Sequence, residues 1–169
     1  VFFSHAWKFR FIEVVASMRK FVDRERGLGD ASKFAGRQIF FWFDVAVVDE
    51  HQSQSFPPEW WSNAFQAAIT AIGHTVLMMA PWSAPIVITR AWCLWEIYCT
   101  LSANAGRGVD LTLGLSVTEE CSLLDALRAH GIDAVLQPFA AIDCRRAEAT
   151  NADDLRKILR AVETGPGYC

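Results

Sequence analysis

The segment His74–Cys99, "HTVLMMAPWSAPIVITRAWCLWEIYC", decides the predicted fold, because a strand, a loop and a helix follow one another in it. Residues 74–80 are almost all apolar, which indicates a strand. The later helix contains Glu96, and this is the only charged residue between Arg90 and Arg107. The segment therefore predicts a strand–loop–helix unit with one isolated carboxyl group in its helix.

Strand and helix patterns alternate along the rest of the chain. Residues 10–26 carry apolar side chains three and four positions apart, which is the spacing of an amphipathic helix. Residues 37–45 are apolar almost throughout, as expected for a strand that is covered on both faces. The remaining segments predict strands at residues 1–5, 109–115 and 134–147 and helices at residues 59–72, 118–130 and 153–163. This alternation predicts an α/β fold with a five-stranded parallel sheet between helices.

The composition indicates a globular domain. The chain has 169 residues, of which 52% are hydrophobic and 21% are charged. These values fit one domain with a sizeable core. We expect residues 1–169 to form a single domain cut from a longer protein, because the chain begins with Val1 and not with Met.

The net charge and the cysteines indicate which binding partners and which cellular compartment to expect. A net charge of -3 does not provide the basic field that nucleic acid binding needs. No apolar run is long enough to cross a bilayer, and "VFFSHAWKFRF" lacks the basic start of a signal peptide. Five cysteines occur without C-x-x-C spacing, which indicates free thiols in a reducing compartment. We therefore expect a cytoplasmic domain that binds neither nucleic acid nor membrane.

In a parallel sheet, ligands bind beyond the carboxyl ends of the strands. The loops expected there are Ser4–Lys8, Asp44–Pro58 and Ala80–Ile88. No G-x-G-x-x-G or Walker-type loop is present, so the usual backbone cradle for phosphates is missing. A metal site formed by Asp44, His5 and the acidic and histidine residues at 49–51 is conceivable, but their spacing matches no known ligand pattern and an exposed charged loop is the simpler interpretation.

Glu96 is the strongest candidate for a functional residue. Trp92 lies one helical turn before it and other large apolar side chains surround it. If the carboxyl group is partly buried, its charged form is disfavoured unless a partner stabilises it. A structural glutamate, bonded to Arg90, to the backbone or to solvent, is the equally weighted alternative.

Four segments resemble the Toll/interleukin-1 receptor (TIR) domain family. "VFFSHAW" resembles its first strand and "IFFWFD" its second strand, which ends in Asp44. "TVLMMAPW" is similar to its third strand, and "RAWCLWEI" places Trp92, Cys93 and Glu96 in register with the family's W-C-x-x-E helix. The "SHAW" form looks most like a TIR-like branch in large multidomain proteins of protists and algae. The resemblance implies a flavodoxin-like three-layer sandwich with five parallel strands.

The resemblance also implies two classes of function in signalling or innate immunity. Some family members cleave NAD+ to nicotinamide and ADP-ribose or cyclic ADP-ribose, with the helix glutamate as the essential residue; this position corresponds to Glu96. Others are scaffolds that bind further TIR domains. For the enzyme, with NAD+ as substrate and no other cofactor or metal, we expect substrate contacts from Ser4, His5, Trp7, Asp44, Trp82 and Trp92. Trp7 and Trp82 could stack on the nicotinamide or adenine ring.

Two features differ from the family pattern. His5 stands where tyrosine is common, and the loop after Asp44 is long and lacks glycine. Because the loop is long and polar, we predict that Val45–Pro58 borders the Glu96 site and sets access to it. In the scaffold alternative the same loop contacts another TIR domain, and a solvated connector is the simplest reading.

Overall fold

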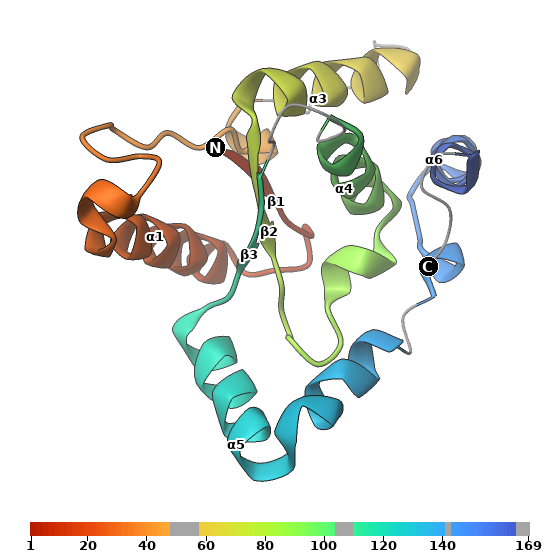
Figure 1. The fold of residues 1–169 in the computed structure, drawn as a ribbon. Coiled ribbons are helices and arrows are strands. Elements are labelled where there is room, and N and C mark those ends of the chain that lie inside the picture. Colours follow the sequence, from red (N-terminus) through yellow and green to blue (C-terminus); the bar gives the residue numbers. More distant parts are fainter. Residues whose placement is uncertain (48–57, 104–109, 141–142, 165–169) are drawn as a thin grey trace.

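The computed structural model describes residues 1–47, 58–103, 110–140 and 143–164. At its centre three parallel strands, β1 (Phe2–Ser4), β2 (His74–Met78) and β3 (Asp110–Gly114), lie in the order β1-β2-β3 (Figure 1). In the middle strand, Val76 pairs with Phe3 on one side and with Thr112 on the other. The predicted central position of the apolar run at residues 74–80 is therefore confirmed.

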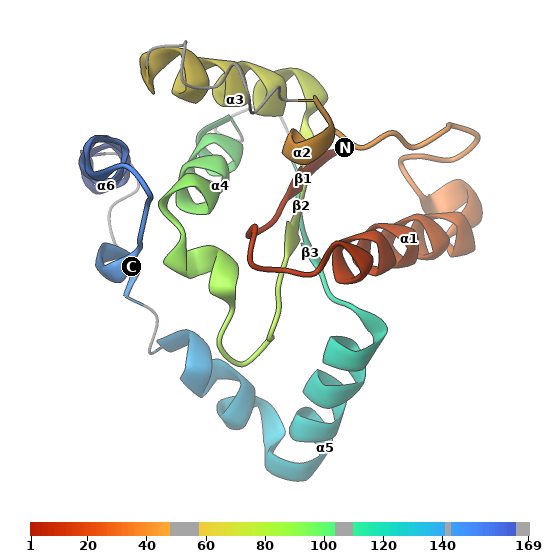
Figure 2. The ribbon, with the colours of Figure 1, turned by 180° about the vertical axis from the view of Figure 1, so that it is seen from behind.

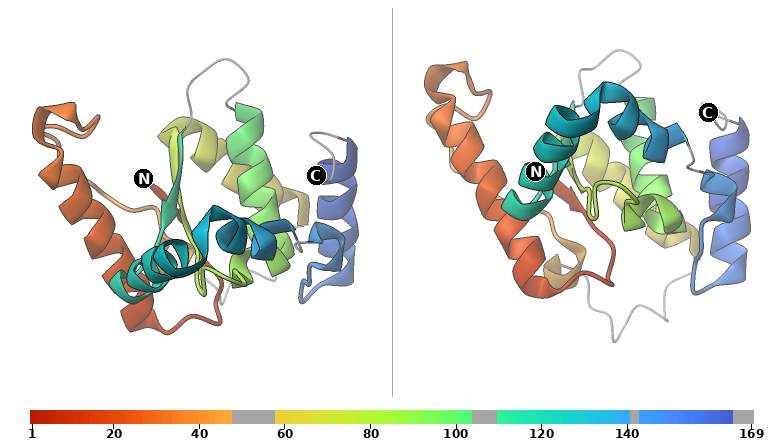
Figure 3. Two further views of the ribbon diagram at one scale, coloured as in Figure 1. Left: turned by 60° about the horizontal axis from the view of Figure 1, so that its bottom comes forward. Right: turned by 90° about the horizontal axis from the view of Figure 1, so that it is seen from below.

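Helices cover both faces of this sheet. The α-helices that agree with the predicted segments to within a few residues are α1 (Phe11–Gly27), α3 (Pro58–Ile72), α4 (Ala91–Ala103) and α6 (Ala152–Thr164). Short helical turns are α2 (Asp44–Val47), η1 (Gly29–Ala31), η3 (Ile86–Thr89) and η4 (Cys144–Arg146). Helix α1 lies on one face of the sheet, α3 and α4 lie on the other, and α6 packs outside α4 (Figures 1 and 3).

The core follows from the alternation of side chains along the strands. Phe3 and Val76 pack with Val14 and Phe21 of α1 on one face. On the other face, Leu77 packs with apolar groups of α4 and its preceding turn. Three short strands are thus enough to separate two apolar layers, although Asp110 and Leu113 of β3 are exposed.

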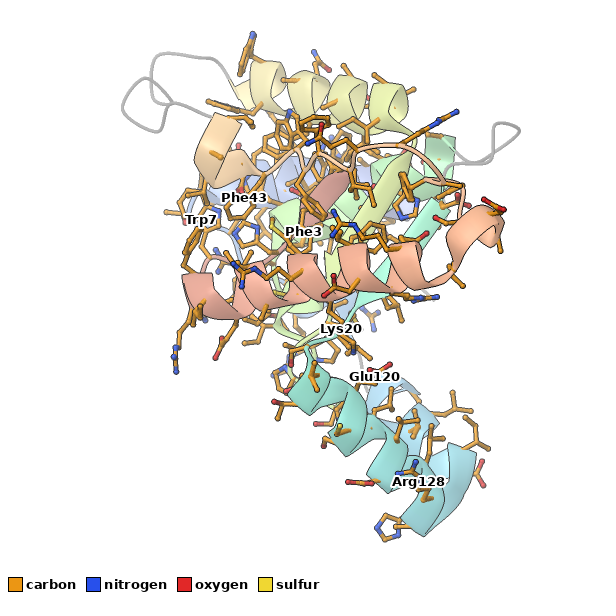
Figure 4. All side chains as sticks on the ribbon, turned by 90° about the vertical axis from the view of Figure 1, so that its left-hand side faces the viewer. Phe3, Trp7, Lys20, Phe43, Glu120 and Arg128 are labelled. Carbon is orange, nitrogen blue, oxygen red and sulfur yellow. The ribbon has the colours of Figure 1, made fainter. Side chains whose placement is uncertain are left out.

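Helix α5 (Val117–Ala140) extends away from the other elements, as Figure 4 shows. Gly131 has φ 74° and ψ -175°, a conformation that favours glycine and kinks the helix where the sequence predicted its end. The first half of α5 is held by a Lys20–Glu120 ion pair and a Lys20 bond of 3.3 Å to the Ser116 carbonyl oxygen. Apolar side chains of α5 that remain exposed are Val117, Leu124, Ile132 and Leu136.

The sheet of the described residues has three strands and not the predicted five. In the expected strand at 37–45, only Trp42 pairs with β1, through Phe3 N to Trp42 O (2.9 Å) and Trp42 N to Val1 O (2.7 Å). Its ring stacks on Phe2 at 4.7 Å between centroids. The strand ends at once because Asp44 starts α2, accepting a 2.8 Å bond from the Val45 amide; Figure 2 shows this turn beside the N-terminus.

The strand predicted within residues 134–147 is wrong for the described part of that segment. Helix α5 continues to Ala140, and Cys144–Arg146 form a helical turn. The buried side chain of Val135 is accommodated on a helix, so its apolar character did not require a strand. None of the described helices has the length and apolar character needed to cross a membrane.

Candidate functional site

Helix α4 carries Glu96 toward the carboxyl end of β1. The side chain is only 6% exposed, and its Oε2 accepts a hydrogen bond from the Ser4 hydroxyl at the end of that strand. On the next turn of α4, Thr100 donates a 2.7 Å bond to the Glu96 backbone oxygen and lies 2.9 Å from the Thr75 hydroxyl on β2. These bonds fix the helix and its carboxyl group against two strands.

Burial raises the pKa of Glu96 to about 8. The hydrogen bond from Ser4 opposes this rise, whereas the nearby charge of Asp44 adds to it. Cys93, one turn earlier on α4, is also buried, and its pKa is raised well above the ordinary value by burial and by Glu96. At neutral pH the site therefore holds a protonated carboxyl group beside a thiol, in a region from which water is largely excluded.

A second pair of polar side chains, His5 and Asp44, lies beside the Ser4–Glu96 pair. His5 Nδ1 is 3.5 Å from Asp44 Oδ1, and the Trp7 indole donates a 2.8 Å hydrogen bond to Asp44 Oδ2. Burial lowers the pKa of His5, and the attraction of Asp44 acts in the opposite direction. The His5 ring packs on Phe43, 4.7 Å between centroids, while Trp7 is 64% exposed (Figure 4). Asp44 thus joins a buried imidazole to an exposed indole.

The structure brings five of the predicted site residues together at the carboxyl end of β1: Ser4, His5, Trp7, Asp44 and Glu96. It places Trp82 elsewhere, with its amide 2.6 Å from Glu119 Oε2 and its indole 3.0 Å from the Ser122 hydroxyl on α5. Trp92 is also separate, because it packs on Phe65 of α3 at 5.7 Å between ring centroids.

The Glu96 carboxyl group lines neither of two hollows in the described chain. One, of about 90 Å³, lies between α3, α4 and α6 and includes Trp92 and Trp95 in its walls. The other, of about 420 Å³, lies at the end of α1. Arg90, the cationic partner considered for Glu96, is instead 3.9 Å from Glu148. Glu96 is therefore buried, and the side-chain group that hydrogen-bonds to it in the described chain is a hydroxyl group and not a cation.

Sequence reasoning missed Thr75 and Thr100, which brace the Glu96 turn of α4. Thr100 is four residues after Glu96 and so shares its face of the helix, which is the signal that could have found it. The partners of Trp82 on α5, Glu119 and Ser122, had no such signal in the sequence. Their contact with Trp82 depends on where a helix that is distant in the chain lies.

In the described ranges, no group of three or more His, Cys, Asp and Glu side chains is arranged to hold a metal ion. Asp49, Glu50 and His51, considered above as ligands, lie outside those ranges, as does most of the loop Val45–Pro58 whose role as a lid was predicted. Compared with protein-family models, with curated proteins and with solved structures, the chain has no significant match in any of the three.

Proposed function

We propose that the chain is a TIR-like domain that cleaves the nicotinamide–ribose bond of NAD+, with Glu96 as the catalytic residue. The observation that carries the proposal is the buried Ser4–Glu96 pair at the carboxyl end of β1, beside His5 and Asp44. This is the edge of a parallel sheet at which ligands bind.

The order of the sheet supports the family. Trp42 pairs with the side of β1 that faces away from β2. Across the sheet the order is therefore the Trp42 segment, β1, β2 and β3, which are the second, first, third and fourth of these segments in the chain. The flavodoxin-like sheet has this order in its first four positions. The W-C-x-x-E residues lie on the helix that follows β2, where the resemblance expects them.

The proposed chemistry needs one carboxylate and no general acid. When the bond from ribose C1′ to the nicotinamide nitrogen breaks, its electron pair stays on nicotinamide, which leaves as a neutral molecule. Positive charge develops on the ribose, and ionised Glu96 stabilises it. Water then adds to C1′ and releases a proton to give ADP-ribose; attack by an adenine nitrogen gives the cyclic product. Ser4 positions the carboxylate, and Trp7 offers an exposed ring for stacking.

Two properties of Glu96 set conditions on this reaction. Its pKa of about 8 leaves it protonated at neutral pH in the free protein, and the cationic nicotinamide ring favours the ionised form when it binds nearby. Because only 6% of the residue is exposed, the proposed reaction requires a shift of the surrounding elements that opens Glu96 to the substrate. Self-association of several copies would provide the energy for that shift.

The test is nicotinamide release from NAD+ by the domain at high concentration and as an enforced oligomer. We expect Glu96→Gln and Glu96→Ala to abolish release, while Glu148→Gln, which changes an exposed glutamate, keeps it. Because kcat/KM reports the free protein, in which burial raises the pKa of Glu96 to about 8, kcat/KM should rise with pH toward that value. Equal release by wild type and Glu96→Gln, with both folded, would reject the catalytic assignment.

The second candidate is a TIR-type scaffold that binds other TIR domains and performs no chemistry. The observation that favours it is the burial of Glu96 with a hydrogen-bond partner from its own chain. In this case Glu96→Gln leaves self-association unchanged, and the enforced oligomer releases no nicotinamide. Size-exclusion chromatography with light scattering measures the self-association of the same samples that are used in the NAD+ assay. Self-association without nicotinamide release indicates the scaffold, and self-association with release indicates the enzyme.

A further inference from the structure

A hollow of about 420 Å³ lies at the end of α1, bordered by η1 and by the chain that returns toward the sheet. We call it the α1–η1 hollow; the lining side chains used below are Val22, Glu25, Arg26, Phe34, Arg37 and Ile39. Helix α1 covers the face of the sheet opposite α4 (Figure 1). The hollow is therefore separate from the Glu96 site.

Short-range bonds give the walls of this hollow a defined shape. The Ser32 hydroxyl donates a 2.6 Å bond to Glu25 Oε2 and accepts a 3.1 Å bond from the Phe34 amide. Gly29 and Gly36 have φ of 54° and 66°, which glycine adopts at little cost, and they turn the chain on either side. A site that is formed before binding loses less conformational entropy when a ligand arrives.

The chemistry of the lining is mixed. Val22, Phe34 and Ile39 provide an apolar part, and the volume falls within the usual range for small-molecule sites. Two arginines and two acidic residues provide the polar part, since Asp30 also lines the hollow. A lining with both signs of charge and no excess of either fits a ligand that carries both charges itself.

Glu25 is the buried member of this set, at 9% exposure. No cation of the described chain lies within ion-pair distance of it. Lys33, whose pKa is lowered by burial against a smaller opposing effect of the Glu25 charge, contacts Asp110 instead. A carboxyl group has more acceptor sites than the one that Ser32 uses, so Glu25 can accept hydrogen bonds from an ammonium group. Buried carboxylates are normally paired, and a ligand ammonium would supply the pair.

Arg26 and Arg37 are exposed and form no ion pair with any described residue. A guanidinium group offers a planar set of donors that matches a carboxylate. We propose that the α1–η1 hollow binds a free amino acid with an apolar side chain. Its ammonium group contacts Glu25, its carboxylate contacts Arg37 or Arg26, and its side chain packs on Val22, Phe34 and Ile39.

The experiment titrates the protein with L-phenylalanine, with phenethylamine, which lacks the carboxylate, and with 3-phenylpropionate, which lacks the ammonium group. Calorimetry or NMR shifts measure the affinities. We expect saturable binding of phenylalanine with a Kd of about 1 mM or lower, and binding of each analogue at least about tenfold weaker. Saturation absent up to about 10 mM, or equal affinity for all three probes, would overturn the proposal.

Two variants test the assigned contacts separately. The double variant Arg26→Gln/Arg37→Gln changes two exposed side chains and should weaken phenylalanine binding about tenfold while leaving phenethylamine binding unaffected. Glu25→Gln keeps an acceptor for the Ser32 hydroxyl but removes the charge that faces the ammonium group. It should weaken the binding of phenethylamine and leave the binding of 3-phenylpropionate unchanged. Arg24→Gln removes a neighbouring exposed charge that does not line the hollow and serves as the control. Variants that bind all three probes as wild type does would contradict the site.

Discussion

Ser4 and Glu96 are 92 residues apart in the sequence and share a buried hydrogen bond that joins the end of β1 to the middle of α4. Both residues are almost completely covered, at 1% and 6% exposure. The bond ties these two elements together beside a second polar contact, in which the Cys93 thiol of α4 donates a 3.2 Å bond to the His5 carbonyl oxygen just after β1. Its removal is expected to be measurable in stability as well as in any activity.

Ser4→Ala should lower the free energy of unfolding by about 1–3 kcal/mol, because the Glu96 carboxyl group loses its donor in a place with little access to water. Urea unfolding measures the loss. Ser17→Ala is a matched control, since Ser17 is equally buried but its hydroxyl has no hydrogen-bond partner in the described chain. That control should change stability by less than about 0.5 kcal/mol or increase it. Equal losses in both variants would mean that the Ser4 bond adds nothing.

Glu96 should make the protein less stable as pH rises. Its pKa is about 8 in the folded chain and 4.5 ordinarily, so between these values the folded state binds more protons than the unfolded state. The stability is complete below pH 4.5 and falls as pH rises to about 8. The full shift corresponds to roughly 5 kcal/mol. Glu96→Gln should remove this pH dependence, so wild type and variant should diverge between urea unfolding at pH 5 and at pH 9.

His74 should act in the opposite direction. Burial, with contributions from Lys33 and the N-terminal ammonium group, lowers the pKa of His74 to about 4. Between pH 6.5 and 4 the unfolded chain binds the proton that the folded chain excludes, so stability falls as pH is lowered through this window. Because Glu96 acts in the opposite direction over the same window, the His74 contribution is read as the difference between wild type and His74→Gln. Between pH 7 and pH 4.5 wild type should lose about 1–2 kcal/mol relative to His74→Gln. His130→Gln, at an exposed position of α5, should keep the wild-type dependence.

Gly114 at the end of β3 should tolerate no side chain. A Cβ atom there would lie 2.9 Å from Val76 Cγ1 and 3.1 Å from Ser17 Oγ, both of which are tightly packed. Gly114→Ala should destabilise the domain by about 1–3 kcal/mol through overpacking. Gly27→Ala is the control, because its Cβ would meet nothing within 4 Å. Thermal unfolding that shifts equally for both variants would show that crowding at β3 is not the cause.

Much of the layered fold was predictable from sequence because periodicity reports on burial. The runs at 74–80 and 109–115 formed strands, and the segments spaced for helices formed α1, α3, α4 and α6. The segments at 37–45 and 134–147 were harder. Phe40, Val45 and Leu136 of these segments are exposed. Trp42 is partly buried through one bridge and stacking on Phe2, and Val135 is buried on a helix. Burial alone does not specify backbone conformation.

The candidate site was predictable for residues whose position follows from the ends of neighbouring strands. Residues that follow β1 and the segment around Trp42 meet at one sheet edge by topology, which brought Ser4, His5 and Asp44 together near Glu96. Trp82 also follows a strand, yet its indole and amide find partners on α5. Such partners depend on the placement of a helix that starts 35 residues later, and no spacing within the loop encodes that placement.

We expect helix α5 to unfold as a cooperative unit separate from the sheet. It packs sparsely against the rest of the described chain and is held mainly by polar contacts at its first turns. Its amide hydrogens should therefore exchange with solvent through local opening, far sooner than those of β2, and a protease should cut it while the sheet stays folded. A single melting temperature of this protein then describes the unfolding of the sheet and its covering helices. The unfolding of α5 has to be measured with a separate probe placed on that helix.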